Sequence, residues 1–147
     1  MKKIMIIVAI AAAAAAFTLA GEHDTPQVSG DYAKLTAGEA VYAGNIAAVG
    51  TNGLAYAVNT AAVGGTLTVC GVFQYSAAKG ENVLVKRGGF ILENATGAGA
   101  IAKKDIGATA YSVATNSWTV TKTSGTKTVG KVADVRDDGS VVVVVGR

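Results

Sequence analysis

The second half of the chain is a series of short apolar, β-branched runs separated by glycine-containing turns. The runs lie in VLVKRGGFILEN (Val83–Asn94), DIGATAYSV (Asp105–Val113), SWTVTKTS (Ser117–Ser124) and TVGKVADVRDDGSVVVVVGR (Thr128–Arg147). Such runs at roughly ten-residue spacing are typical of a small barrel or sandwich of short strands. Few of their side chains are suited to catalysis, which favours a protein that provides a surface or an assembly.

Turn signals indicate where the strands reverse. Asn52-Gly53 separates Ala40–Gly50 from Leu54–Val58, and Asn-Gly is a strong hairpin signal because both central residues of that turn need positive φ. Thr66–Tyr75 follows as a longer strand. Three further hairpins are predicted: Asn82–Lys86 with Gly89–Glu93 around Arg87-Gly88-Gly89, Thr109–Ala114 with Ser117–Lys122 around Thr115-Asn116, and Thr128–Val135 with Val141–Val145 around Asp137-Asp138-Gly139.

The consecutive valines Val141–Val145 predict a strand covered on both faces, in the core or at a subunit interface. No segment after residue 35 keeps a helical apolar period, and the alanine-rich stretch Asn59–Val63 is too short to form a helix alone. The sequence therefore predicts an all-β fold, a small β-barrel or sandwich of short antiparallel strands. A helical or extended N-terminal segment precedes it.

Residues 1–20 form a hydrophobic, Ala-rich segment with two interpretations. Lys2 and Lys3 precede the uncharged stretch Ile4–Phe17, and small residues near Ala20 complete the pattern of a cleavable signal peptide. As a helix the stretch would span about 26 Å against a bilayer core of about 30 Å, which makes it a marginal membrane anchor. The alanines Ala11–Ala16 are strong helix formers and favour instead a retained assembly helix or arm.

The chain divides into three segments, residues 1–20, 21–34 and 35–147. Residues 21–34 are polar, contain the only proline, Pro26, and have little capacity to bury apolar area, so they are predicted to be a linker or arm. Residues 35–147 are the predicted β-domain. A chain of 147 residues is of the right size for one such domain.

The charge and the rare reactive residues limit the classes of function. Without Lys2 and Lys3 there are 13 − 2 = 11 basic residues against 10 acidic ones, and no basic stripe with interleaved aromatics, so nucleic-acid binding is not expected. Cys70, the only cysteine, lies in an apolar run and is expected to be a small buried core residue without a disulfide. The only histidine, His23, lies in the polar linker, so a reactive Cys-His pair or a Ser-His-Asp triad is not expected.

Two motifs resemble binding sites without the surroundings that such sites need. Gly97–Ala102 has the letters G-x-G-x-x-A, but Gly107 would interrupt the helix that must face a dinucleotide pyrophosphate, so we expect a surface loop and no cofactor. Asp134, Asp137 and Asp138 lack the distal glutamate of a calcium loop. They are predicted to form a hairpin turn, with a weak cation site as the alternative.

The remaining candidates are single residues or pairs. Asn94-Ala95-Thr96 is a glycosylation sequon, which matters only in a eukaryotic secretory pathway. Glu81 and Glu93 are interpreted as separate surface carboxylates rather than a catalytic pair. Trp118 and Tyr111 are predicted to be core or interface anchors, with sugar stacking as the alternative. No catalytic, cofactor-binding or metal-binding residue is therefore expected.

Four short signatures follow one another along residues 36–147. They are V-K-R-G at Val85–Gly88, D-I-G at Asp105–Gly107, T-V-T-K-T at Thr119–Thr123 and G-K-V at Gly130–Val132. Their order and spacing resemble a family of small tailed-phage virion proteins, the capsid decoration or head-fibre-like proteins encoded near the major capsid protein.

The resemblance implies a small β-barrel that binds the outside of a capsid, commonly as a homotrimer, and stabilises it without enzymatic activity. The expected partner is the major capsid protein and the expected location is the virion surface. The arm 21–34 is expected to contact the capsid or a neighbouring subunit by adding a strand to a sheet edge. The alternative is an exported bacterial β-domain, secreted or periplasmic after cleavage near Ala20, that acts as a surface-binding or adhesion module. Contact with a membrane is expected only if residues 1–20 act as a signal or anchor.

Overall fold

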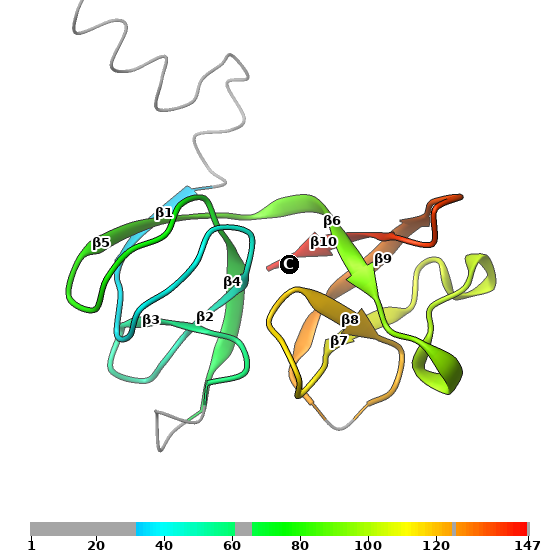
Figure 1. Cartoon of the computed structure of the whole chain (residues 1–147), viewed down its shortest axis with the longest axis horizontal. Helices are drawn as coiled ribbons and strands as arrows, with labels where there is room; N and C mark the ends of the chain where they lie inside the picture. The colour runs from blue at the N-terminus through cyan, green and yellow to red at the C-terminus, as the bar shows by residue number, and fades with distance from the viewer. Residues whose placement is uncertain (1–31, 61–65, 125, 147) are drawn as a thin grey trace, which may run out of the picture. The chain divides into compact units, whose positions relative to one another are not determined.

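The chain forms short β-strands throughout the part that the structure, a computed structural model, describes, namely residues 32–60, 66–124 and 126–146. The predicted all-β fold class is confirmed. Two short 3-10 turns, η2 and η3, join β6 to β7 (Figure 1). The elements are β1 Tyr32–Thr36, β2 Ile46–Val49, β3 Ala55–Ala57, β4 Thr68–Phe73, β5 Asn82–Lys86, β6 Gly88–Asn94, η2 Gly97–Gly99, η3 Lys103–Asp105, β7 Thr109–Ser112, β8 Thr119–Thr121, β9 Thr128–Val135 and β10 Val141–Val145.

The first strand begins within the segment predicted to be a linker. Because β1 starts at Tyr32, the end of the segment 21–34 belongs to a sheet. Residues 1–31, which include the predicted signal or assembly helix, lie outside the described residues.

The strands β1 to β5 form a sheet in the order β1-β5-β4-β2-β3. Just beyond β1, Ala37 forms a parallel bridge with Ala55 of β3, and Gly38 N donates to Ala55 O at 2.8 Å. This bridge brings the two outer strands of the sheet together. The enclosed side chains form a buried cluster around Phe73, with Ala37, Val41, Ala47, Ala55, Ala77, Val83 and Val85.

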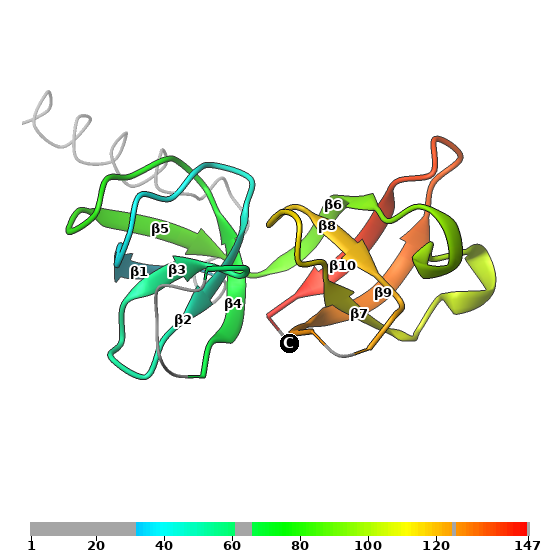
Figure 2. The same ribbon diagram turned by 60° about the horizontal axis from the view of Figure 1, so that its bottom comes forward.

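The strands β6 to β10 form a closed barrel in the order β10-β6-β8-β7-β9 (Figure 2). Most neighbours are antiparallel, as predicted, but β6 and β8 pair in parallel through Glu93 with Thr119 and Asn94 with Val120. The parallel pair arises because a loop and the returning strand β7 separate β6 from β8 along the chain. Closure leaves the barrel without an open sheet edge.

The predicted hairpin across Arg87-Gly88-Gly89 is wrong. Strand β5 pairs with β4 and β1, whereas β6 pairs with β10 and β8, so the chain leaves one sheet and enters the other (Figure 1). Only Arg87 separates the two strands. Gly88 has a φ of 135°, a conformation that glycine adopts readily, and here it lies in an extended connection instead of a turn.

The other predicted reversals are confirmed as hairpins. Strands β2 and β3, β7 and β8, and β9 and β10 are antiparallel neighbours. In the last of them Gly139 has a φ of 88°, and Arg136 N donates to Ser140 O at 2.9 Å to close the turn. Glycines with positive φ, Gly53 and Gly139, therefore mark two of these reversals correctly.

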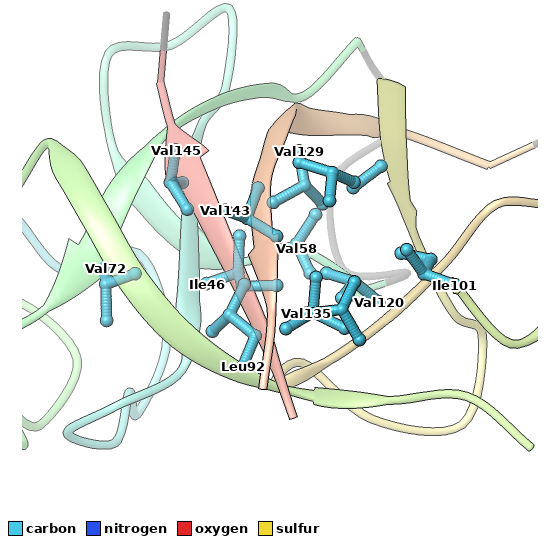
Figure 3. Packing of buried hydrophobic residues seen from close by; sticks show 13 residues of the cluster. Ile46, Val58, Val72, Leu92, Ile101, Val120, Val129, Val135, Val143 and Val145 are labelled. Atoms are coloured by element: carbon cyan, nitrogen blue, oxygen red, sulfur yellow. The ribbon is translucent and has the colours of Figure 1, made fainter. Parts of the chain in front are cut away.

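Strand β10 lies at the centre of the largest buried cluster. Val141, Val143 and Val145 are fully buried in this cluster, whereas Val142 and Val144 are half-buried. Figure 3 shows Val143 and Val145 among the other buried side chains. The prediction that both faces of this strand are covered is therefore correct for the face of Val141, Val143 and Val145, whereas the opposite face is only partly covered. Residues of the first sheet, among them Ile46 and Val72, belong to the same cluster.

Candidate interaction surface

Strands β6 and β10 direct alternate side chains away from the barrel interior. Ile91 lies opposite Val142, and Gly89 lies opposite Val144 in the antiparallel register. Since side chains alternate along a strand and the intervening residues are buried or pack against the core, these four positions face outward. Ile91 is 59% exposed, a large fraction for an isoleucine in a strand.

Trp118 extends this face towards β8. It directly precedes β8, is 47% exposed, and donates from Nε1 to Glu93 Oε2 at 2.8 Å. Glu93 follows Ile91 by two residues on β6, so both point outward. The hydrogen bond holds the indole in a defined orientation on the outside of the barrel. We call Ile91, Glu93, Trp118, Val142 and Val144 the barrel outer face.

Charged residues border the barrel outer face on β9. Asp134 lies opposite Val142 and Lys131 opposite Val144. Lys131 Nζ donates to Thr109 Oγ1 at 2.8 Å, which fixes the lysine side chain on the outside of the barrel. An apolar centre with a charged and polar rim is the usual composition of a protein–protein interface.

A shallow depression of about 270 Å³ lies next to the Trp118 segment. The hydroxyl of Thr119 is buried there and has no hydrogen-bond partner among the residues that the structure describes. A buried hydroxyl without a partner destabilises the fold, so this position favours a polar group of a ligand or a water molecule. The lining residues are Glu93, Asn94, Ala95, Thr96, Val113, Thr115, Asn116 and Thr119.

The glycine-rich motif Gly97–Ala102 forms a loop, as expected. Gly97–Gly99 is a single 3-10 turn closed by Ala100 N donating to Gly97 O at 3.1 Å, and no helix N-terminus follows it. The next turn is held by Asp105, whose Oδ2 accepts from Ala102 N at 2.8 Å. This backbone hydrogen bond, helped by Lys122 at 3.7 Å, lowers the pKa of Asp105.

The three clustered aspartates act separately. Asp138 accepts from both the hydroxyl and the backbone N–H of Ser140, and these hydrogen bonds lower its pKa. Asp137 pairs with Lys103 at 3.2 Å, and Asp134 accepts from the backbone of Val135. The predicted hairpin turn is therefore present. Within residues 32–60, 66–124 and 126–146, no three His, Cys, Asp or Glu side chains lie close enough together to hold a metal ion.

Asn94 has a structural role that its sequon does not indicate. Its side-chain amide donates to Ile101 O at 2.8 Å and to Gly139 O at 3.1 Å, and its oxygen accepts from Ile101 N at 2.8 Å. The side chain therefore connects the η2 loop to the β9–β10 turn. A glycan on this nitrogen would disrupt these hydrogen bonds.

Glu81 and Glu93 are separate carboxylates with different partners, in agreement with their interpretation from the sequence. Glu81 lies in the turn before β5, where it accepts from a backbone N–H, whereas Glu93 lies on the barrel and binds Trp118. Tyr111 is opposite Thr121, not opposite Trp118. The exposure of Trp118 shows that it is not a core residue, which leaves the interface and sugar-stacking interpretations.

Cys70 lies on β4 of the first sheet, and its side chain is half-buried. Its Sγ donates to Ala47 O at 3.5 Å, and burial raises its pKa to about 11 although Arg87 acts in the opposite direction. The thiol is therefore protonated at neutral pH and is a poor nucleophile.

Comparisons with known proteins give no further information about this site. No family model, no curated protein and no solved structure matches the chain. Across the described ranges, no helix has the length and apolar character needed to cross a bilayer.

Sequence reasoning did not find Ile91 and Val142 as surface residues. The signal was present, since Phe90, Ile91 and Leu92 are consecutive apolar residues in one strand. In a strand with one buried face, at least one of the three must point outward. Which one does so depends on the pairing of β6 with β10, and that pairing was not predicted.

Proposed function

We propose that this protein is a structural virion protein that covers and stabilises the outside of a phage capsid through the barrel outer face. The observation that supports this most is the apolar centre of that face, formed by the exposed Ile91 and Trp118 and the half-buried Val142. The order of the sequence signatures is similar to that of capsid decoration proteins, which supports the same assignment.

The geometry restricts how such a protein can bind. The closed barrel offers no free sheet edge, so this part of the chain cannot bind a partner by pairing an edge strand and must use side chains of its strands and loops. Trp118 and Ile91 are large enough to act as anchors in a partner pocket, and Trp118 is pre-oriented by Glu93. The proposed partners are the major capsid protein and further copies of this chain in a homotrimer.

Binding to a mature lattice stabilises that lattice by mass action. A protein present at a hundredfold excess over its dissociation constant stabilises each site by about 2.7 kcal/mol. Because a capsid carries many equivalent sites, small contributions per site add to a large total. No reaction is required, so the proposal needs no catalytic group.

Electron microscopy of particles assembled with and without the protein tests this proposal. We expect added density at regular positions on the outer surface and greater resistance of the decorated particles to heat. Identical particles in the two preparations would contradict the proposal.

The second candidate is an exported binding module, for which the depression beside Trp118 is the supporting observation. The exposed indole of Trp118 can stack on a sugar ring, and polar residues that line the depression, among them Asn116 and Thr115, can form hydrogen bonds with the sugar. Trp118 is the only tryptophan, so its fluorescence would report binding of soluble oligosaccharides. Mass analysis of the native N-terminus separates the candidates, because cleavage after Ala20 favours export and an intact start favours assembly.

A further inference from the structure

The two five-stranded sheets share one strand order. The first sheet is β1-β5-β4-β2-β3, and the parallel bridge from Ala37 to Ala55 joins the chain after β1 to β3. The barrel, started at β6, is β6-β10-β9-β7-β8, and the parallel pair of β6 with β8 closes it. Adding five to each strand number of the first sheet gives the strand order of the barrel.

The irregularities of the two sheets also coincide. The β2–β4 pairing shifts register directly after Ala47 pairs with Gly71. The β7–β9 pairing shifts register directly after Ala110 pairs with Gly130. Because the β-bulge occurs at the corresponding position in both sheets, it belongs to the fold and is not a local irregularity of one sheet.

The glycines at these bulges meet the same obstacle. A Cβ atom at Gly71 would collide with the backbone oxygen of Lys86 on β5, and one at Gly130 would collide with that of Val144 on β10. Lys86 and Val144 are themselves counterparts, because each pairs with the residue that directly follows the glycine. Lys86 pairs with Val72, and Val144 pairs with Lys131. Both glycines are therefore required by the same close approach of two strands.

Loop hydrogen bonds repeat with the same geometry. In each sheet a positive-φ glycine and the residue after it lead into a strand, β2 or β7. The backbones of these two residues form two hydrogen bonds with one residue of the long strand, β4 in the first sheet and β9 in the barrel. The bonds are Gly44 N to Phe73 O (2.9 Å) and Phe73 N to Asn45 O (3.0 Å) in the first sheet, and Gly107 N to Val132 O (2.8 Å) and Val132 N to Ala108 O (3.0 Å) in the barrel.

The parallel closures and the short hairpins repeat as well. Gly38 N donates to Ala55 O at 2.8 Å, and Ala95 N donates to Val120 O at 2.9 Å. Asn52 Oδ1 accepts from the backbone N–H two residues later at 3.1 Å, and Asn116 makes the same turn with the same distance. These bonds lie in loops, so they do not follow from strand order alone.

We propose that the chain is a tandem of two copies of one barrel module, residues 32–86 and 88–145, and that the first module carries a module-binding face which the second lacks. The partner of this face is the second module of the chain. The inference rests on the fold alone and is independent of the proposed function.

The module-binding face is identified by comparing counterpart residues. Ile46 and Val72 pair with each other in the first module, and Thr109 and Lys131 pair at the same register in the second. Ile46 and Val72 are buried in the cluster that contains the barrel core (Figure 3). Lys131 is exposed and bonded to Thr109. The same face is therefore apolar where a module covers it and polar where none does.

The contact between the modules includes a hydrogen bond, from Ile46 N to Ser117 O at 2.6 Å. On the second module, the charge of Lys131 would have to be desolvated if another module packed on the equivalent face. Terminal repeats of arrays carry polar outer faces for this reason.

The repeated geometry can be tested on the unaltered full chain by NMR couplings across hydrogen bonds. We expect four correlations, from the amides of Gly44, Phe73, Gly107 and Val132 to the carbonyl carbons of Phe73, Asn45, Val132 and Ala108. Loss of either correlation in one module, when both are present in the other, would overturn the duplication.

The module-binding face is tested by Val72→Lys in the full chain, with Lys131→Val as the matched control. We expect Val72→Lys to speed amide exchange at Ile46 by about tenfold or more while Phe73 and Val132 stay protected. Lys131→Val should leave Ile46 unchanged.

Equal effects of the two variants at Ile46, or joint loss of protection at all three amides, would refute a separate face. If Val72→Lys does not fold, the isosteric Val72→Thr is measured with the same readouts. An unchanged exchange rate at Ile46 in that variant would also refute the proposal.

Discussion

At the scale of single residues, Gly130 lies so close to the backbone of β10 that there is no room for a side chain. We expect Gly130→Ala to lower the free energy of unfolding by about 3 kcal/mol, because a methyl group there collides with the Val144 carbonyl. Gly89→Ala is the matched control, since its Cβ would meet only Val142 Cγ1 at 4.0 Å. Urea denaturation measures both variants, and equal stabilities would contradict the close approach of β9 and β10.

Cys70 provides a second test at this scale. Its pKa is raised from 9.0 to about 11 by burial, so its thiolate fraction near pH 8 should be about a hundredfold lower than that of an ordinary cysteine. We expect iodoacetamide to react correspondingly slowly with the folded chain and at the normal rate in urea. Fast alkylation of the folded chain would show that the thiol is not held against Ala47.

The burial raises the pKa of an acid, so the folded state binds this proton more tightly than the unfolded state. The stability associated with Cys70 is therefore present at neutral pH. It is lost as the pH rises above the ordinary thiol pKa.

At the scale of elements, β10 separates core from surface within one strand. Val143→Asp should unfold the barrel because it places a charge among fully buried side chains. Val142→Asp should leave the fold intact, because Val142 faces outward on the barrel outer face. Circular dichroism and thermal unfolding distinguish the two. A charge at Val143 therefore tests the core, whereas a charge at Val142 tests an interface.

The β9–β10 turn predicts a dependence on pH. Hydrogen bonds from Ser140 lower the pKa of Asp138, so its contribution to stability is present above the usual aspartate pKa of about 3.9 and is lost as the pH falls through the lower folded value. We expect the wild-type melting temperature to fall in acid more than that of Asp138→Asn. The effect is small because the carboxylate is exposed. An identical acid response of the two proteins would contradict this role.

Local sequence signals predicted most of the elements and failed at one connection. Asn52-Gly53 and Asp138-Gly139 were correctly interpreted as turns, because positive φ is a local requirement. Gly88-Gly89 has the same composition but connects two sheets, because β5 and β6 find partners elsewhere in the chain. Pairing partners are a property of the whole chain, which is why the parallel β6–β8 pair was not predicted either.

At the scale of the whole molecule, the duplication is concealed in the sequence. Counterpart core residues differ, as Phe73 and Val132 show, since each module needs only an apolar side chain of suitable volume. The counterpart glycines persist because backbone contact allows no alternative there. The barrel outer face could not be predicted from the sequence for a related reason. Its residues are as apolar as the core, and only the register of β6 with β10 separates the two sets.

Co-sedimentation of the chain with purified capsid particles measures whether the barrel outer face binds a capsid. Ile91→Lys alters the barrel outer face, and Ile106→Lys, at another isoleucine that is 48% exposed, is the matched control. We predict saturable binding of the wild type and of Ile106→Lys. Ile91→Lys should bind about thirtyfold more weakly, as expected for the loss of about 2 kcal/mol at an anchor residue. Equal binding of all three proteins, or no binding of the wild type, would contradict capsid binding through the barrel outer face.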